Sequence, residues 1–119
     1  MKKPRIKQVK KPWGGFDEFA TNQKCTVKVI TVNAGGKLSL QAHKRRNELW
    51  VALDSGLAAE IMGKKKRMAV GNPVFVPRGA KHRIHGGKRK ARFLEVSFGR
   101  FSEKDITRFE DKYGRVGKR

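Results

Sequence analysis

The feature of this sequence that most constrains its fold is a series of short apolar stretches, each followed by turn residues. TVKVITV at 26–32 alternates apolar with polar side chains and leads into the turn Asn33-Ala34-Gly35-Gly36. ELWVALD at 48–54 ends at Ser55-Gly56, and ARFLEVSFG at 91–99 alternates again. Short strands with turn signals every ~8–12 residues are typical of antiparallel sandwiches and small barrels. The sequence therefore predicts an all-β chain that forms an antiparallel sandwich or a small barrel.

One stretch near the end of the chain has the features of a helix instead. In SEKDITRFEDKYG at 102–114, Ser102 can cap a helix and Asp105 stands three residues further on. Ile106 and Phe109 form a short apolar stripe at helical spacing. We therefore expect a short C-terminal helical segment after the barrel.

The length of the chain, 119 residues, suits one domain with a single modest core. We expect a flexible basic arm over 1–11, a folded domain over 12–115 and a basic tail over 116–119. Cys25 is the only cysteine, which excludes an internal disulfide. No apolar run approaches membrane-spanning length and no signal-peptide pattern is present. These observations predict a cytoplasmic protein without a membrane partner.

The charge of the chain is strongly positive, because 30 Lys and Arg face 10 Asp and Glu and leave a formal charge of +20. Such an excess attracts phosphorylated metabolites, nucleic acid or anionic lipid. Basic runs lie at 2–11, 64–67 and 88–92. They contain no interleaved aromatic side chains on which bases would stack. Nucleic acid is therefore a partner that the charge allows but the pattern does not favour.

Polar side chains gather in QAHKRRNELW at 41–50, between two apolar stretches. Alternate side chains of a strand share a face, so Gln41 and His43 point the same way. Four residues separate His43 from Glu48, which is enough for a turn that brings Glu48 back. An amide oxygen, an imidazole nitrogen and a carboxylate oxygen can then converge on one cation. The alternative is a polar bend between two strands.

Two spaced motifs resemble those of the cupin superfamily, in which a small β-barrel holds one divalent metal ion. They are Gly36-x6-His43-x4-Glu48-x7-Gly56 and Gly71-x5-Pro77-x-Gly79-x2-His82. More specifically, the chain resembles the cupin domain of type II mannose-6-phosphate isomerases from about Lys11 to Arg115. The motifs that carry this resemblance are Lys11-Pro12-Trp13-Gly14, Lys37-Leu38-Ser39-Leu40-Gln41-x-His43, Arg46-x-Glu48-x-Trp50, Pro77-x-Gly79-x2-His82-Arg83 and Asp105-Ile106-x-Arg108-Phe109-Glu110-Asp111-x-Tyr113-Gly114-Arg115. The resemblance implies a cupin domain over 12–115, that is, a double-stranded β-helix or jelly-roll-like barrel.

The resemblance also implies roles for individual residues. It implies one divalent metal ion, with zinc first and manganese, cobalt, magnesium or nickel as alternatives, on the ligands Gln41, His43, Glu48 and His82. It implies catalytic and substrate-binding roles for Arg46, Arg108 and Arg115, and a substrate-binding place for Trp13. Arg45 departs from the family, which usually carries His there. A cation at this position would weaken metal binding if it pointed at the site.

The function that the resemblance implies is interconversion of mannose 6-phosphate and fructose 6-phosphate through an enediol. The general base is open between a metal-bound hydroxide, Glu48 and Glu110. At the residue level, His43 and His82 can instead be hydrogen-bonded barrel residues, and Arg108 can simply neutralise a neighbouring acid. The alternative functions are a non-catalytic cupin that binds metal and sugar phosphate and, less favoured, a nucleic-acid-binding cupin. We expect a homodimer, because small barrels have edges to cover.

Overall fold

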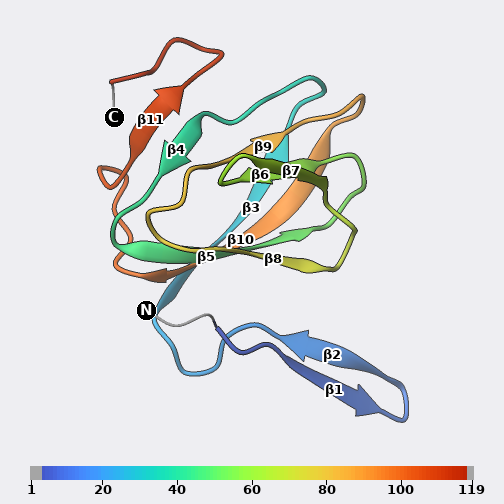
Figure 1. The fold of residues 1–119 in the computed structure, drawn as a ribbon. Helices are drawn as coiled ribbons and strands as arrows, with labels where there is room; N and C mark the ends of the chain where they lie inside the picture. Colours follow the sequence, from blue (N-terminus) through green and yellow to red (C-terminus); the bar gives the residue numbers. More distant parts are fainter. Residues whose placement is uncertain (1–3, 118–119) are drawn as a thin grey trace.

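The computed structural model describes residues 4–117, which form eleven strands and no helix (Figure 1). This part of the chain therefore contains no helix that is long and apolar enough to cross a membrane. The strands are β1 (Lys7–Lys11), β2 (Gly14–Glu18), β3 (Cys25–Val32), β4 (Leu40–Ala42), β5 (Arg46–Ala52), β6 (Ala58–Ile61), β7 (Lys64–Arg67), β8 (Pro73–Val76), β9 (His82–His85), β10 (Ala91–Gly99) and β11 (Thr107–Glu110).

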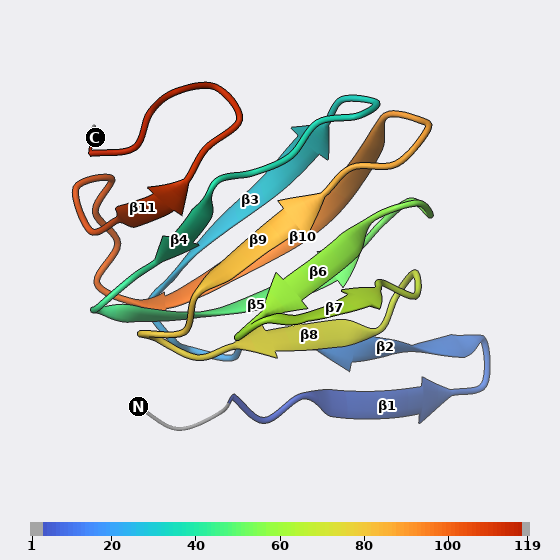
Figure 2. The same ribbon diagram turned by 45° about the horizontal axis from the view of Figure 1, so that its top comes forward.

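Nine of these strands form two antiparallel sheets that face each other (Figures 1 and 2). One sheet has the order β3-β10-β5-β8 and the other has the order β11-β4-β9-β6-β7. The all-β prediction is confirmed. The main core lies between the sheets and is built on ten buried side chains: Val32, Trp50, Ala52, Leu57, Ala59, Met68, Val76, Ile84, Ala91 and Phe93.

The central strands β5 and β10 are covered on both faces. Phe93 of β10 packs in the main core, while Val96 and Phe98 join Leu49 in a second cluster on the opposite face. Phe19 and other residues of the N-terminal segment pack on that second cluster. Double coverage buries every residue of β5, which explains why ELWVALD reads as a nearly continuous apolar run.

The N-terminal region forms a hairpin. Lys7–Lys11 pair with Gly14–Glu18, and this two-stranded ribbon projects away from the two sheets (Figures 1 and 2). The segment 7–11, expected to be a flexible arm, is therefore strand β1. Residues 1–3 of that arm and residues 118–119 of the predicted basic tail lie outside the described residues.

The predicted C-terminal helix is wrong. Thr107–Glu110 form β11, which extends the edge of the second sheet by pairing with β4. Ser102 caps only a single turn, in which its hydroxyl accepts a hydrogen bond from the Lys104 N–H. The short apolar stripe was insufficient for a helix. The N–H and C=O groups of residues 107–110 can instead form their hydrogen bonds with the open edge of β4.

Candidate metal centre

Three side chains from separate elements meet in the interior of the barrel. His43 follows β4, Glu48 lies on β5 and His82 begins β9, and all three are buried. Their candidate ligand atoms lie within 4.8 Å of one another. The Glu48 carboxylate is 3.6 Å from His43 Nε2 and 3.8 Å from His82 Nε2. The structure therefore brings together three of the four predicted metal ligands.

Both imidazoles are oriented by main-chain carbonyls. His43 Nδ1 lies 2.6 Å from the Asp105 carbonyl oxygen, and His82 Nδ1 lies 2.9 Å from that of Ala80. A carbonyl only accepts, so each Nδ1 carries the proton and each Nε2 keeps its lone pair. Both Nε2 atoms lie near Glu48, and that of His43 also lies 3.2 Å from the Arg46 guanidinium. Burial lowers the pKa of His43 and of His82, and outweighs the opposing effect of the Glu48 carboxylate. Both rings are thus held in the neutral form that binds metal.

The Glu48 carboxylate is held by donors from three neighbours. Trp50 Nε1 donates to Oε1 at 3.1 Å, and Arg46 Nε donates to Oε2 at 3.1 Å. The Ser97 hydroxyl donates to Oε2 at 3.5 Å. The Trp50 ring also stands edge-on to the His82 ring, with centroids 5.4 Å apart. These contacts compensate a buried charge and fix the direction in which its remaining lone pairs point.

The position of Gln41 follows from strand register. Gln41 is paired with His82 across β4 and β9, and directly opposed residues of an antiparallel pair have their side chains on the same face. The Gln41 amide nitrogen donates to the Ser39 carbonyl at 3.4 Å, so the oxygen is the atom that this side chain can offer to a cation. The register therefore places Gln41 on the face of His82, and its role as a fourth ligand stays a prediction.

The turn before β9 joins the two halves of the site. Gly79 has φ of +83°, a left-handed conformation that favours glycine, and its N–H donates to the His43 carbonyl at 2.7 Å. The Ala80 N–H closes the same turn on the Pro77 carbonyl at 3.2 Å. The spacing from Pro77 to His82 thus sets His82 beside His43.

The donor set fits a divalent cation. It offers two imidazole nitrogens and a carboxylate oxygen, with an amide oxygen adjacent, which suits zinc and several harder ions. Metal–ligand distances of about 2.0–2.2 Å place two donors of one ion up to about 4 Å apart. The separations of 3.6 Å and 3.8 Å from Glu48 to the histidines lie in that range.

Comparison with known proteins agrees with this geometry. Residues 2–111 match the family model described as mannose-6-phosphate isomerase C-terminal. The chain belongs to this family. One relative is the mannose-1-phosphate guanylyltransferase ManC of Salmonella typhimurium, which is 37% identical over 92% of this chain and 23% of ManC. Another is the xanthan biosynthesis protein XanB of Xanthomonas campestris, which is 39% identical over 92% of this chain and 24% of XanB. The chain thus spans about a quarter of the length of the curated relatives it matches.

Solved structures show that this family member has the cupin fold. A cupin protein from Bacteroides fragilis has a TM-score of 0.58 at 20% identity, covering 66% of this chain and 68% of that one. The capsular polysaccharide assembling protein CapF from Staphylococcus aureus has a TM-score of 0.67 at 17% identity, covering 90% of this chain and 35% of CapF. The cupin fold prediction is confirmed.

The four predicted substrate residues of this family member lie in different surroundings. Arg46 is buried in the metal centre, where its guanidinium lies 3.2 Å from His43 Nε2 as well as on Glu48. Arg108 of β11 is paired with Gln41, so its side chain shares the face of Gln41. Arg115 instead makes a two-point ion pair with Asp111, at 2.7 Å and 3.2 Å.

Trp13 is not at the metal centre of its own chain. It occupies the turn between β1 and β2 and is 74% exposed. Its predicted role in substrate binding therefore has no counterpart among the contacts within residues 4–117.

Arg45, the departure from the family pattern, points away from the metal centre. The side chains of Lys44 and Arg45 are exposed, whereas those of His43 and Arg46 on either side are buried. The backbone N–H groups of Lys44 and Arg45 both donate to the Asp105 carboxylate, at 2.8 Å and 3.0 Å. This bend interrupts the strand alternation and turns the Arg45 cation outward.

Three functional contributions are absent from the sequence predictions. They are the Asp105 carbonyl on His43, the Trp50 N–H on Glu48, and Glu95, a buried acid of β10. Burial raises the pKa of Glu95 to about 7, and the nearby Glu48 carboxylate adds to the rise. The alternation in ARFLEVSFG did contain a signal for Glu95. It places the Glu95 side chain on the same face of the strand as Phe93, a side chain expected to be buried. Nothing local indicated Asp105, which is 62 residues from His43.

Proposed function

We propose that the protein is a metal-dependent sugar-phosphate isomerase that interconverts mannose 6-phosphate and fructose 6-phosphate through an enediol. The observation that carries the proposal is the convergence of two neutral imidazoles on a buried, hydrogen-bonded carboxylate. Membership of the mannose-6-phosphate isomerase C-terminal family supports it. The guanylyl transfer in the names of longer relatives is not part of the proposal.

The chemistry needs stabilised oxygens at C1 and C2 of the open-chain sugar. A divalent cation bound by His43, Glu48 and His82 would supply Lewis-acid stabilisation of the negative charge on those oxygens. Arg46 adds a fixed guanidinium in the same buried space, where it can polarise a substrate hydroxyl. Burial excludes water and strengthens both interactions.

Arg108 is the residue that we propose for the substrate phosphate. It lies two strands from His82 across the β11-β4-β9 row, and strands are about 4.8 Å apart, so about 10 Å separates the two backbones. An extended sugar phosphate spans a comparable length. Guanidinium binds phosphate oxygens in two-point geometry. Glu110, one of the candidate bases, is instead paired with Arg83 at 2.9 Å.

The test combines elemental analysis with a coupled isomerase assay, in the presence of zinc, manganese, cobalt, magnesium or nickel. We expect about one metal ion per chain and turnover of mannose 6-phosphate. His82→Ala should lose both, with a drop in kcat/KM of at least about 100-fold. His85→Ala is the matched control, because His85 is paired with Glu60 at 2.8 Å. Metal-loaded protein that shows no turnover would contradict the proposal.

A second candidate is a cupin that binds metal and sugar phosphate without turnover. The observations that favour it are the exposed Trp13 and the Asp111-bound Arg115, two predicted substrate residues that are engaged elsewhere or solvated. Calorimetry separates the two functions. Mannose 6-phosphate binding that requires metal but gives no fructose 6-phosphate supports the second candidate.

A further inference from the structure

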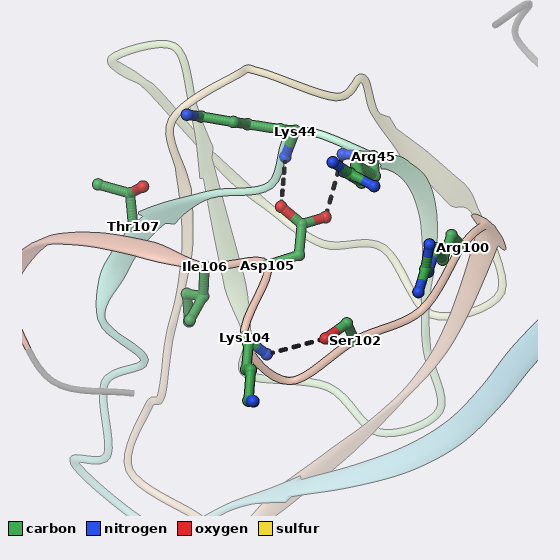
Figure 3. Close-up of a pocket in the computed structure, with 8 residues that line it drawn as sticks. All are labelled: Lys44, Arg45, Arg100, Ser102, Lys104, Asp105, Ile106 and Thr107. Atoms are coloured by element: carbon green, nitrogen blue, oxygen red, sulfur yellow. Dashed lines mark hydrogen bonds between the residues drawn. The ribbon is translucent and has the colours of Figure 1, made fainter.

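A basic hollow lies at the turn that directly follows His43. Its volume is about 340 Å³, and it is enclosed by the turn after β4 and by residues 100–107 between β10 and β11 (Figure 3). Four cationic side chains line it: Lys44, Arg45, Arg100 and Lys104. Ser102 and Thr107 add hydroxyl groups to the wall.

These four cations have no acidic partner in the hollow. None of them forms an ion pair within residues 4–117. Asp105 is the single acid of the wall, and its two oxygens accept the backbone N–H groups of Lys44 and Arg45 (Figure 3). Partial burial acts to raise the pKa of Asp105, but these donors and the nearby charges outweigh it and lower the pKa. The carboxylate is therefore occupied by main-chain N–H groups, and the four cationic side chains remain available to bind an anion.

The hollow is separate from the metal centre. His43 Nε2 points to Glu48, whereas its Nδ1 donates to the Asp105 carbonyl on the opposite side of the ring. Arg46, a residue of the metal centre, donates from NH1 to the Ser102 carbonyl at 3.1 Å. The segment from Ser102 to Asp105 thus forms a wall shared by the two sites.

We propose that this hollow binds a phosphate group, either as inorganic phosphate or as the end of a small phosphate monoester. Several unpaired cations in one concave site recognise a compact dianion better than a flat surface does, and the two arginines can bind its oxygens in two-point geometry. The volume lies near the lower end of small-molecule sites, which span about 300–1,000 Å³. The site does not depend on the isomerase activity, because none of its four cations belongs to the metal centre.

The test is isothermal titration of the metal-free full chain with inorganic phosphate, mannose 6-phosphate and mannose, at a constant ionic strength of about 0.15 M. We expect saturable one-to-one binding of phosphate or the ester, and none of mannose. If both inorganic phosphate and mannose 6-phosphate bind, either can fill the site. If only mannose 6-phosphate binds, the ligand is a phosphate monoester. Arg45→Gln and Arg100→Gln should each weaken binding about tenfold.

Two further variants keep the result specific. Arg89→Gln removes the same charge from an exposed loop that lines a different hollow, and should change the affinity less than twofold. His82→Ala should bind phosphate normally, because it alters only the metal centre. The proposal is overturned by the absence of saturable binding, by equal weakening in Arg89→Gln, or by loss of binding in His82→Ala. Isomerase turnover enters none of these readouts, so failure here is distinct from failure of the proposed function.

Discussion

At the scale of single residues, Asp105 connects the chemistry of the metal centre to the shape of its wall. Its carbonyl accepts the proton of His43 Nδ1, and its carboxylate holds the turn that directs Arg45 outward. Asp105 thus orients a candidate ligand through its main chain, and through its side chain it holds the turn that keeps the Arg45 cation away from the site. Such supporting contacts commonly contribute 10–100-fold to metal affinity.

Replacement of Asp105 by Ala should therefore affect both stability and metal binding. We expect a loss of about 1–2 kcal/mol in the free energy of unfolding, since two N–H groups lose their acceptor. Alanine keeps the main-chain carbonyl that accepts from His43 Nδ1, so we expect metal affinity to fall by about tenfold at most, through loosening of the turn next to His43. Urea unfolding of the metal-free protein and competitive metal titration measure the two effects. Glu103→Ala, in the same loop but exposed, is the control, and equal behaviour of the two variants would refute this role.

Glu95 should make the stability of the metal-free protein depend on pH. Its pKa is raised from 4.5 to about 7 by burial and by Glu48, with Lys28 and Arg46 opposing the rise. The folded state therefore holds a proton that the unfolded state has released, and stability falls as pH rises from about 4.5 to about 7. Glu95→Gln removes this loss and should be more stable than the parent by about 1–3 kcal/mol at pH 8, with no difference at pH 4.

Chemical denaturation at several pH values measures this difference. The lowered pKa values of His43 and His82 act with the opposite sign, because the unfolded state binds protons first as pH falls below 6.5. Both histidines are present in the parent and in Glu95→Gln, so their effect cancels in the comparison. A difference between the two proteins that is the same at pH 4 and pH 8 would exclude this account of Glu95.

At the scale of elements, the β1–β2 hairpin has the weakest support from its own chain. Among residues 4–117 its strands pair only with each other, and the hairpin projects from the sheets (Figure 2). The exposed Trp13 lies at its turn. The outer face of the β3-β10-β5-β8 sheet exposes Val27 and Val29, at 56% and 55%. A projecting ribbon and an apolar sheet face on one molecule are complementary surfaces for a second copy. We propose that they meet in a homodimer.

Light scattering on a size-exclusion column tests the dimer. We expect the mass of two chains for the parent and a shift toward one chain for Trp13→Ala, since interface aromatics typically contribute about 2 kcal/mol or more. Met62→Ala, which truncates another exposed apolar side chain, should leave the mass unchanged. A parent protein that elutes as a monomer at all concentrations and salt conditions would count against the proposal.

At the scale of the whole molecule, the charge of +20 is the dominant feature. Strand β7, Lys64–Arg67, is exposed at every residue and lies at the edge of its sheet, where charged side chains deter pairing with other chains. Arg67, Lys88 and Arg89 line a hollow on the same part of the surface. No aromatic side chain interrupts these runs, so nucleic-acid binding stays the less favoured prediction.

Screening of this charge should stabilise the protein. Raising sodium chloride from about 0.05 M to about 0.5 M should raise the Tm by several degrees, because self-repulsion in the folded state decreases. Differential scanning calorimetry measures the shift. Lys65→Glu with Lys66→Glu reduces the charge on the exposed β7 and should show a smaller salt response. A Tm that is independent of salt in both proteins would mean that self-repulsion is negligible.

Much of the fold and site could be predicted because the relevant signals are local. Period-two alternation depends only on neighbouring residues, and it correctly indicated β3 and β10, while a short apolar run ended by Ser55-Gly56 indicated β5. The resemblance to cupin motifs correctly brought His43, Glu48 and His82 together. The helix expected over 102–114 failed, because a strand edge distant in sequence decided the conformation of 107–110.

The sequence by itself determined an all-β chain with turns at defined spacings and a set of donors able to hold a cation. Only the tertiary structure decided which distant groups support the site. The Asp105 carbonyl orients His43 from 62 residues away, and the Ser97 hydroxyl donates to Glu48 from 49 residues away. The tertiary structure also decided that Arg45 lines a basic hollow outside the metal centre. The physical reason is the separation along the sequence over which each interaction acts. Alternation and turn geometry are set by adjacent residues, whereas burial, pKa and hydrogen-bond partners are set by strands that meet only after the chain has folded.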